Sequence, residues 1–380
     1  MKSTKKVLII GVFRSSKTKD KIPCSSPEYL TNLFHKAYID VLTTSKYVNR
    51  ISRFFDTIFT ILFYSNEYDI AIVPWFNGKG SYIWQEIASR LLKLLNKKVV
   101  LVIRGGGIPD LIDRYPHKYL RTLQRVDLVV CPSTFISSRL VKHRINNIVI
   151  ENPLDLSKYP FHSKENFALN LLWMRTLEPL YNPVMAMEVA KILKEKNLPF
   201  SLYIAGQNNG QLKELIELQK KYQLEKEVTF CGFINHEQKL EMVRKCDLYI
   251  CTNNVDNAPV SFIEMMSLGV PIVSTNVGGI PHFITDNKNG FLVNVNDAKA
   301  MADKLLEIHL CPSIGKTFAE NGFEFSRKFS EKSVLEKWST QLNLLRGLVI
   351  KQTTKTIVLQ QGVSEDEYGV LQDEYSTQSK

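Results

Sequence analysis

The feature of this sequence that most constrains its fold is a repeated alternation of short apolar runs with longer segments of helical periodicity. In the N-terminal half, the apolar runs are residues 7–13, 70–75, 98–103 and 128–131. Uninterrupted apolar runs of this length are typical of strands buried on both faces of a parallel sheet. Segments such as 82–95, which repeat apolar residues at helical spacing, lie between them. The pattern predicts an α/β domain with a doubly wound sheet.

A second series of the same kind follows. Residues 183–196, 210–222 and 236–244 have helical periodicity. The short apolar runs around them predict six more strands, at residues 169–174, 201–205, 227–230, 248–251, 271–274 and 290–293. Two Rossmann-like domains facing each other across a cleft would follow, with ligands bound at the carboxyl ends of the strands.

We therefore divide the chain into four parts. Pro153 and Pro160 mark the linker between the two series. The parts are an N-terminal Rossmann-like domain at 1–160, a C-terminal Rossmann-like domain at 161–325, a C-terminal helix at 326–348 that packs back toward the N-terminal domain, and a polar tail at 349–380.

Charge is distributed unevenly along the 380 residues. Residues 1–153 hold 24 of the 49 Lys and Arg residues but only 11 of the 38 Asp and Glu residues. The N-terminal half is therefore basic, which favours an anionic partner or is simply a solvated basic surface. We find no nucleic-acid-binding motif and no metal-ligand spacing, so we expect an anionic membrane surface or a phosphate-bearing acceptor, no nucleic acid and no metal site.

The scattered cysteines favour a reducing compartment. The apolar run at 7–13 is shorter than a signal peptide requires, and no stretch reaches the length of a membrane-spanning helix. We expect a cytoplasmic protein, or one that is peripheral at the inner face of the membrane. The segment 36–64 mixes basic and aromatic residues, which predicts either an interfacial helix on anionic lipid or a core helix with a basic outer face.

Three sequence regions contain the candidate site residues. Asp256 is followed by small residues and Pro259, and then by a helix that contains Glu264. The start of such a helix suits a phosphate, and a carboxylate near the loop can accept hydrogen bonds from a pair of vicinal hydroxyls such as a ribose offers. Arg175 stands at the end of a predicted strand, where its planar guanidinium can bind two diphosphate oxygens.

In the N-terminal half, Arg104-Gly105-Gly106 follows a strand in the same way. Glycines there let a backbone approach a ligand closely. Arg104 would then bind an acceptor phosphate or the donor diphosphate, or else only stabilise its loop.

In these motifs the chain resembles the retaining glycosyltransferases of family 4, which have the GT-B fold. Asp256 and Glu264 have the spacing of the two acidic residues that characterise that family. The resemblance continues through the motifs around Gly206, Gly232 and the G-G-I-P sequence at 278–281. Three positions depart from the family pattern: the first acid is Asp where relatives have Glu, Tyr181 stands where they have Lys, and Arg104 stands near where they often have a His.

The resemblance makes residues 1–160 the acceptor-side domain and residues 161–325 the nucleotide-sugar-binding domain. It also implies roles for the candidate residues. Arg175, Asp256 and Glu264 would be catalytic, with Arg175 at the leaving diphosphate, Asp256 at the donor sugar and Glu264 at the ribose. The donor would also contact Tyr181, Gly206, Gly232, Phe233, Asn257, Ala258, Pro259 and Val260. The N-terminal loops would contribute Gly11, Arg14, Arg104, Gly105 and Gly106.

The function predicted from this resemblance is transfer of a hexosyl unit from a nucleotide diphosphate sugar, UDP- or GDP-linked, to a sugar or lipid-linked glycan hydroxyl. The configuration would be retained, no cofactor would be needed, and the pathway would be surface polysaccharide or glycolipid assembly. Two alternatives stay open: a nucleotide-sugar epimerase or phosphorylase of the same fold, and a binding subunit without catalytic activity.

Overall fold

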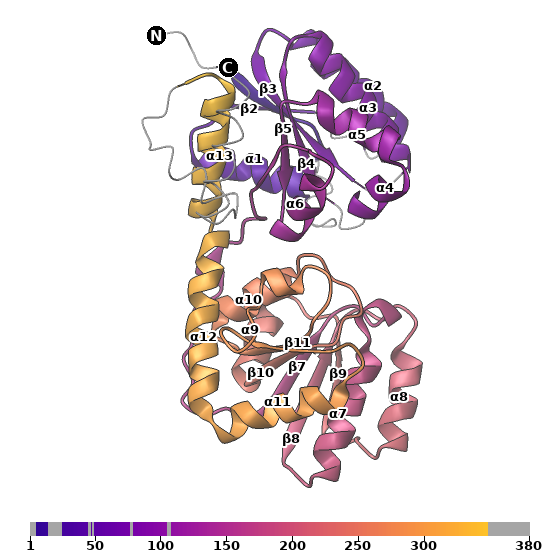
Figure 1. Ribbon diagram of the computed structural model, residues 1–380, viewed down its shortest axis with the longest axis vertical. Coiled ribbons are helices and arrows are strands. Elements are labelled where there is room, and N and C mark those ends of the chain that lie inside the picture. Colours follow the sequence, from indigo (N-terminus) through magenta and orange to yellow (C-terminus); the bar gives the residue numbers. More distant parts are fainter. Residues whose placement is uncertain are drawn as a thin grey trace, which may run out of the picture.

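The protein consists of two α/β domains joined by a linker and by a pair of C-terminal helices (Figure 1). The structure, a computed structural model, describes residues 5–13, 25–44, 47, 49–76, 79–104 and 108–348. Each domain is built around one six-stranded sheet in which all paired strands are parallel. The predicted fold class, two doubly wound Rossmann-like domains, is confirmed.

The N-terminal sheet has the strand order β2-β1-β3-β4-β5-β6. Its strands are β1 (Lys6–Ile9), β2 (Val41–Thr43), β3 (Tyr68–Trp75), β4 (Lys98–Ile103), β5 (Leu128–Cys131) and β6 (Asn147–Val149). The edge strands β2 and β6, of three residues each, were not predicted. The connecting helices are α1 (Ser26–Lys36), α2 (Arg50–Phe63), α3 (Lys79–Leu94), α4 (Ile108–Arg114), α5 (Pro116–Arg125) and α6 (Thr134–Val141).

The C-terminal sheet has the order β12-β11-β10-β7-β8-β9. All six predicted strands are present: β7 (Leu169–Met174), β8 (Phe200–Ala205), β9 (Val228–Gly232), β10 (Leu248–Cys251), β11 (Ile272–Thr275) and β12 (Phe291–Val293). The helices of this domain are α7 (Pro183–Glu195), α8 (Leu212–Lys221), α9 (His236–Lys245), α10 (Val260–Leu268) and α11 (Ala298–Leu310).

Alternating side chains of the strands fill two cores in each domain. In β1, Leu8 packs into one cluster, while Val7 and Ile9 pack into the cluster on the opposite face. This alternation follows from the two-residue period of a strand, and it explains why nearly every residue of these runs is apolar. The sheet is therefore covered on both faces, and its functional groups lie on the loops at the strand ends.

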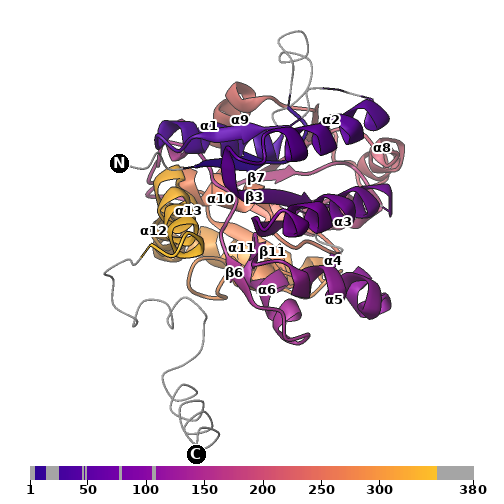
Figure 2. The same cartoon turned by 90° about the horizontal axis from the view of Figure 1, so that it is seen from above.

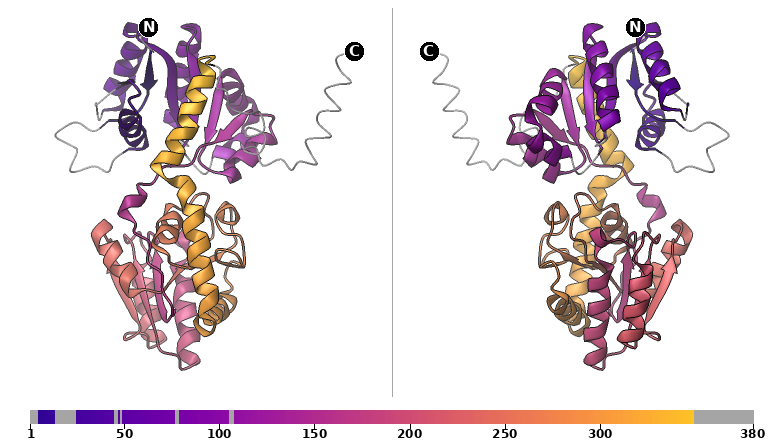
Figure 3. Two further views of the ribbon diagram at one scale, coloured as in Figure 1. Left: turned by 90° about the vertical axis from the view of Figure 1, so that its left-hand side faces the viewer. Right: turned by 90° about the vertical axis from the view of Figure 1, so that its right-hand side faces the viewer.

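Two consecutive helices connect the domains at their side, α12 (Pro312–Ser326) and α13 (Glu331–Leu345) (Figure 3). Phe318 of α12 belongs to a core of the C-terminal domain, whereas Trp338 of α13 belongs to a core of the N-terminal domain. Trp338 meets Phe34 edge to face, with ring centroids 5.8 Å apart. The chain thus returns to its first domain after completing the second.

Candidate donor site and interdomain cleft

Two charged side chains meet at the carboxyl edge of the C-terminal sheet, where β7 and β10 lie side by side. Arg175 is the first residue after β7, and Asp256 lies in the loop that leads from β10 to α10. The Nη2 group of Arg175 donates a hydrogen bond to Oδ2 of Asp256. Their side chains are only 19% and 12% exposed, so the pair is largely shielded from solvent.

Asp256 also determines the course of its own loop. Its Oδ2 accepts a hydrogen bond of 2.8 Å from Nδ2 of Asn253, and its Oδ1 accepts one of 3.2 Å from the backbone N–H of Ala258. Both carboxylate oxygens therefore have partners within the protein. The loop from 256 to 260 is held against the sheet edge by these contacts.

Arg175 retains binding capacity beyond its contact with Asp256. Its guanidinium lies 5.2 Å from the ring centroid of Tyr181, a cation–π contact. Burial is the main cause that raises the pKa of the Tyr181 phenol, so this side chain is neutral at pH 7. The Nε of Arg175 is buried and has no hydrogen-bond partner among the described residues. A ligand oxygen at that point would satisfy a donor whose desolvation is otherwise uncompensated.

The backbone of Gly206 lies against Arg175. A Cβ on Gly206 would lie 1.7 Å from the carbonyl oxygen of Arg175, so no other residue fits there. The N–H of Gly206 donates to the carbonyl of Gly232 at 2.8 Å, and the ring of the next residue, Phe233, is 75% exposed. Gly206 thus permits a close approach of two loops, and Phe233 presents an open apolar surface beside them.

The Gly278-Gly279 pair supports the loop that contains Asp256. Gly278 has φ +53°, and a Cβ there would lie 2.2 Å from the carbonyl oxygen of Asp256. A Cβ on Gly279 would lie 2.1 Å from the carbonyl oxygen of Asn257. The N–H of Gly279 donates to the carbonyl of Asp256 at 2.8 Å. These contacts give the G-G-I-P motif a structural role: it lets two loops pack backbone against backbone.

Glu264 of α10 is 8% exposed and forms a buried ion pair. Nζ of Lys239 lies 2.7 Å from each of its two oxygens, and the Tyr159 hydroxyl donates to Oε1 at 2.8 Å. Burial, followed by the charge of Glu264, raises the pKa of Tyr159 far above its usual range, which keeps the hydroxyl protonated as a donor.

Sequence reasoning did not identify Lys239 or Tyr159. Lys239 belongs to α9, whose sequence resembles that of an ordinary surface helix, and Tyr159 belongs to the interdomain linker. Neither residue lies in a motif, and only the tertiary structure brings both to Glu264.

The start of α10 is open to a ligand. Pro259 is the N-cap residue, and no side chain caps the helix. Val260, the first helical residue, is 47% exposed. The uncapped N–H groups and the helix dipole make this end favourable for an anion. The predicted donor residues 257–260 therefore lie between the Arg175–Asp256 pair and a helix start that can accept phosphate.

On the N-terminal side, Arg104 follows β4 and is largely buried. Its Nη1 donates to Oδ1 of Asn152 in the linker, while its Nε has no hydrogen-bond partner among the described residues. Burial lowers the pKa of Arg104 to about 10, so it stays charged at pH 7. The N–H of Gly11 donates to the Thr44 hydroxyl at 3.1 Å. The other predicted residues of these loops, Arg14, Gly105 and Gly106, lie outside the described residues.

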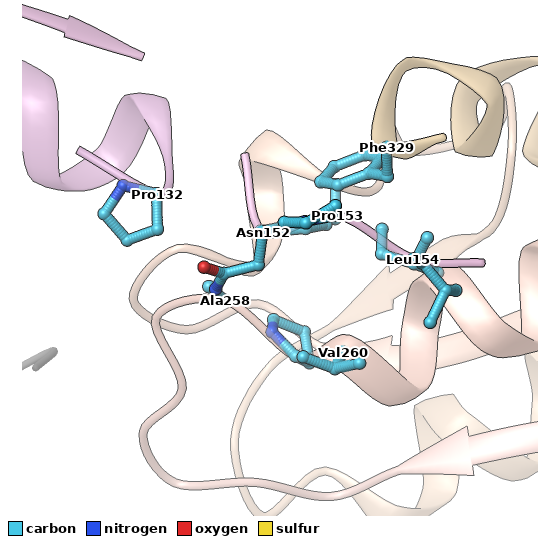
Figure 4. Close-up of a pocket in the computed structure, with 10 residues that line it drawn as sticks. Pro132, Asn152, Pro153, Leu154, Ala258, Val260 and Phe329 are labelled. Atoms are coloured by element: carbon cyan, nitrogen blue, oxygen red, sulfur yellow. The ribbon is translucent and has the colours of Figure 1, made fainter. Parts of the chain in front are cut away.

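A small pocket lies where the domains meet (Figure 4). It lies beside Asn152, the residue that accepts the hydrogen bond from Arg104. Its lining is mostly apolar and comes from the first domain, the linker, the 258–263 region and the α12–α13 junction: Pro132, Asn152, Pro153, Leu154, Ala258, Pro259, Val260, Ile263, Phe283 and Phe329. The pocket thus lies between the candidate donor loop and the N-terminal domain.

Across the described ranges, no three His, Cys, Asp or Glu side chains come together as a metal site would require. The helices of those same ranges include none that is both long and apolar enough to span a bilayer.

Comparisons with known proteins place the C-terminal domain in a family. Residues 157–325 match the model of the glycosyl transferases group 1. A proposed colanic acid biosynthesis glycosyltransferase of Escherichia coli, WcaL, is 27% identical over 231 residues, which cover 57% of this chain and 56% of the relative. The amylovoran biosynthesis glycosyltransferase AmsK of Erwinia amylovora is 25% identical over 269 residues, 65% of each chain. The chain thus spans less than two thirds of these relatives.

Solved structures share the architecture over most of the chain. Anabaena HepE, in complex with UDP and glucose, superposes with a TM-score of 0.63 at 17% identity, covering 89% of this chain and 99% of its own. The sucrose-phosphate synthase of Thermosynechococcus elongatus gives 0.68 at 15% identity, covering 91% and 100%. At such identities the likeness concerns the fold alone. Residues 157–325 of this protein are thus similar to the glycosyl transferases group 1, and the chain as a whole has the GT-B fold.

Proposed function

We propose that this protein is a retaining glycosyltransferase that moves a hexosyl unit from a UDP- or GDP-linked sugar to a hydroxyl of a sugar or lipid-linked glycan. Its place would be the assembly of a surface polysaccharide or glycolipid. Two of the relatives above are named for polysaccharide biosynthesis, which supports the pathway class. The family of the C-terminal domain supports the reaction class.

The observation that carries the proposal is the buried Nε of Arg175, which has no hydrogen-bond partner among the described residues, beside the start of α10, where the N-cap residue Pro259 makes no side-chain cap. Both groups are cationic or partially positive, and both adjoin the loop from 256 to 260. A nucleoside diphosphate supplies the charge and the oxygen acceptors that this arrangement lacks.

In the proposed reaction, the bond between the anomeric carbon and the donor phosphate oxygen breaks. The electron pair leaves with the nucleoside diphosphate, whose growing negative charge Arg175 stabilises in a site shielded from water. The acceptor oxygen forms the new bond to the anomeric carbon, and its proton passes to the departing phosphate. Catalysis would thus rest on charge stabilisation and on positioning of the two substrates.

The carboxylates would position the donor. Glu264 would accept hydrogen bonds from the ribose hydroxyls while Lys239 and Tyr159 hold it in place. Asp256 would face hydroxyls of the donor sugar and orient Arg175. On the acceptor side, Arg104 would bind a phosphate, because it is largely buried and its side-chain partner among the described residues is a neutral amide.

The first experiment is a thermal-shift screen of the full chain against nucleotides and nucleotide sugars. A ligand present at a concentration of about a hundred times its Kd stabilises the folded state by about 2.7 kcal/mol. This stabilisation raises the melting temperature by several degrees. We expect one UDP- or GDP-sugar to shift the wild type and to lose that effect in Arg175→Ala. The matched control is Arg125→Ala, which removes an ion-paired arginine of the N-terminal domain.

The control variant should keep the full ligand-induced shift relative to its own melting temperature. Turnover is then measured as nucleoside diphosphate release with glycan acceptors, and the anomeric configuration of the product by proton NMR. Absence of any shift at millimolar concentration across the panel would remove the basis of the proposal. An inverted product would overturn the retaining mechanism alone.

A further inference from the structure

Helix α2 directs its apolar side away from the body of the N-terminal domain. Only Thr57, Thr60 and Ile61 of this helix are buried. A surface helix of a globular protein ordinarily shows the reverse arrangement. On the outer side, five large apolar side chains are 48–69% exposed at helical spacing, Ile51, Phe55, Phe59, Leu62 and Phe63. The expectation of a core helix with a basic outer face was therefore wrong.

The neighbouring helix α3 extends this apolar surface. It packs beside α2 on the same side of the domain (Figure 2). Ile83, Ile87 and Leu94 of α3 are 57%, 38% and 79% exposed, and their spacing places them on one side of the helix. We call these three residues and the five of α2 the α2–α3 face. Contiguous apolar surfaces of this kind mark sites of contact with a protein or a membrane.

Cations border the α2–α3 face along α5, which adjoins α3. The Tyr82 hydroxyl of α3 donates to the carbonyl of Lys118 in α5 at 3.0 Å, and Nζ of Lys118 lies 4.6 Å above the Tyr82 ring. His117, Lys118 and Arg121 are exposed, and α5 contains no acidic residue. Among the described residues, Lys118 and Arg121 have no ion-pair partner. The border is therefore positively charged and available to anions.

From these observations we infer that the α2–α3 face docks onto an anionic lipid surface, with its aromatic side chains at the boundary of headgroups and acyl chains. A helix with an aromatic apolar side and neighbouring cations is suited to that environment. The excess of basic residues in 1–153 attracts an anionic lipid surface by long-range electrostatics. A second copy of this chain fits less well, because an isologous contact would bring the α5 cations of two copies together.

The position of the face in the fold suits an enzyme with a lipid-linked acceptor. Helices α2 and α3 follow the carboxyl ends of β2 and β3, and Arg104 follows the end of β4 in the same parallel sheet. The face therefore starts at the sheet edge that carries the candidate acceptor residue. Docking would hold that edge near the membrane surface. The inference extends the proposed function but does not depend on it, because lipid binding needs no nucleotide sugar.

Vesicle co-sedimentation of the full chain tests this inference. Vesicles of phosphatidylcholine alone are compared with vesicles that contain about 30% phosphatidylglycerol, at low and at high salt. The apolar variant is Phe59→Ser with Phe63→Ser, and the charge variant is Lys118→Glu with Arg121→Glu. The matched control is Val141→Ser with Leu310→Ser, which removes two side chains that are 61% and 79% exposed on other helices.

We expect the wild type to bind the anionic vesicles and the apolar variant to bind them about tenfold or more weakly at both salt concentrations. The charge variant should lose binding mainly at low salt, because screening reduces its contribution at high salt. The control should bind like the wild type. All variants should keep the melting temperature of the wild type. Where a donor is known, they should also keep the rise in melting temperature that the donor causes in the absence of vesicles.

Three outcomes would overturn the inference. The wild type could fail to bind anionic vesicles, or the control could lose as much binding as the apolar variant. In the third outcome, light scattering would find a wild-type dimer that the apolar variant dissociates, with no vesicle binding by either. That result would assign the face to self-association. A missing donor shift with intact vesicle binding would instead count against the proposed function alone.

Discussion

At the scale of single residues, the two largely buried arginines of the cleft differ in their partners. Arg175 is paired with the carboxylate of Asp256, whereas among the described residues the side-chain partner of Arg104 is the neutral amide of Asn152. A buried charge without a counter-charge costs free energy, and here that cost is visible as a pKa of Arg104 lowered to about 10. A residue kept at such a cost is suited to binding an anionic ligand.

Replacing Arg104 by methionine should therefore stabilise the protein without ligand, by about 1 kcal/mol or more, because a desolvated charge is removed. The measurement is urea unfolding followed by circular dichroism. Arg125→Met is the control, because Arg125 is ion-paired with Glu86 at 2.9 Å and its loss should destabilise the fold. Equal destabilisation by the two variants would show that Arg104 is structural and would contradict its role as an anion site.

At the scale of elements, the candidate donor site depends on loops that pack backbone against backbone. The 256–260 loop lies directly on Gly278 and Gly279, and it leads into the open start of α10. The orientation of Asp256 is thus coupled to a loop that contributes no side chain to it. This coupling explains why the G-G-I-P motif accompanies the acidic pair in the sequence.

Gly278→Ala should therefore displace the loop from 256 to 260. The new methyl group would lie 2.2 Å from the carbonyl oxygen of Asp256, so the variant should lose about 1–3 kcal/mol of stability and most of its donor-induced thermal shift. Gly347→Ala is the matched control: its φ of +72° is also unfavourable for alanine, but no atom of the described residues lies within 4 Å of the added group. Equal loss of donor binding in both variants would argue against the clash as the cause.

At the scale of the whole molecule, the two domains are connected twice, by the linker and by the α12–α13 pair. Trp338 of α13 is 2% exposed and lies in a core of the N-terminal domain, although it follows the complete C-terminal domain in sequence. Tyr159 of the linker donates a hydrogen bond to Glu264 in the C-terminal domain. Domain position and the candidate donor site are therefore linked by direct contacts.

Trp338→Ala should cost about 3–5 kcal/mol and should destabilise the N-terminal domain first. Hydrogen exchange measured by mass spectrometry should show faster exchange in peptides from the N-terminal sheet. The comparison is Phe318→Ala, which removes a core residue of the C-terminal domain and should accelerate exchange there. If both variants accelerated exchange in the same peptides, α13 would not be stabilising the first domain specifically.

The sequence by itself determined the fold class. A strand such as 98–103 is buried on both faces of the sheet, so nearly every position in it must be apolar. Continuous apolar runs of this kind can be recognised in the sequence. Strands of three residues carry little periodicity, so the edge strands β2 and β6 escaped prediction; the equally short β12 was predicted as the last apolar run of the second series. The acidic pair and Arg175 were identified because they follow strand ends at a recognisable spacing.

The tertiary structure alone decided which side chains meet. Lys239 and Tyr159 reach Glu264 from 25 and 105 residues away, and no local pattern encodes such contacts. The orientation of α2 was also decided by the tertiary structure, because its amphipathic sequence fits a helix whose apolar side faces the core as well as one whose apolar side faces outward. Periodicity shows that a helix has an apolar side, but only the packing of the neighbouring elements decides whether that side faces the core or the surroundings.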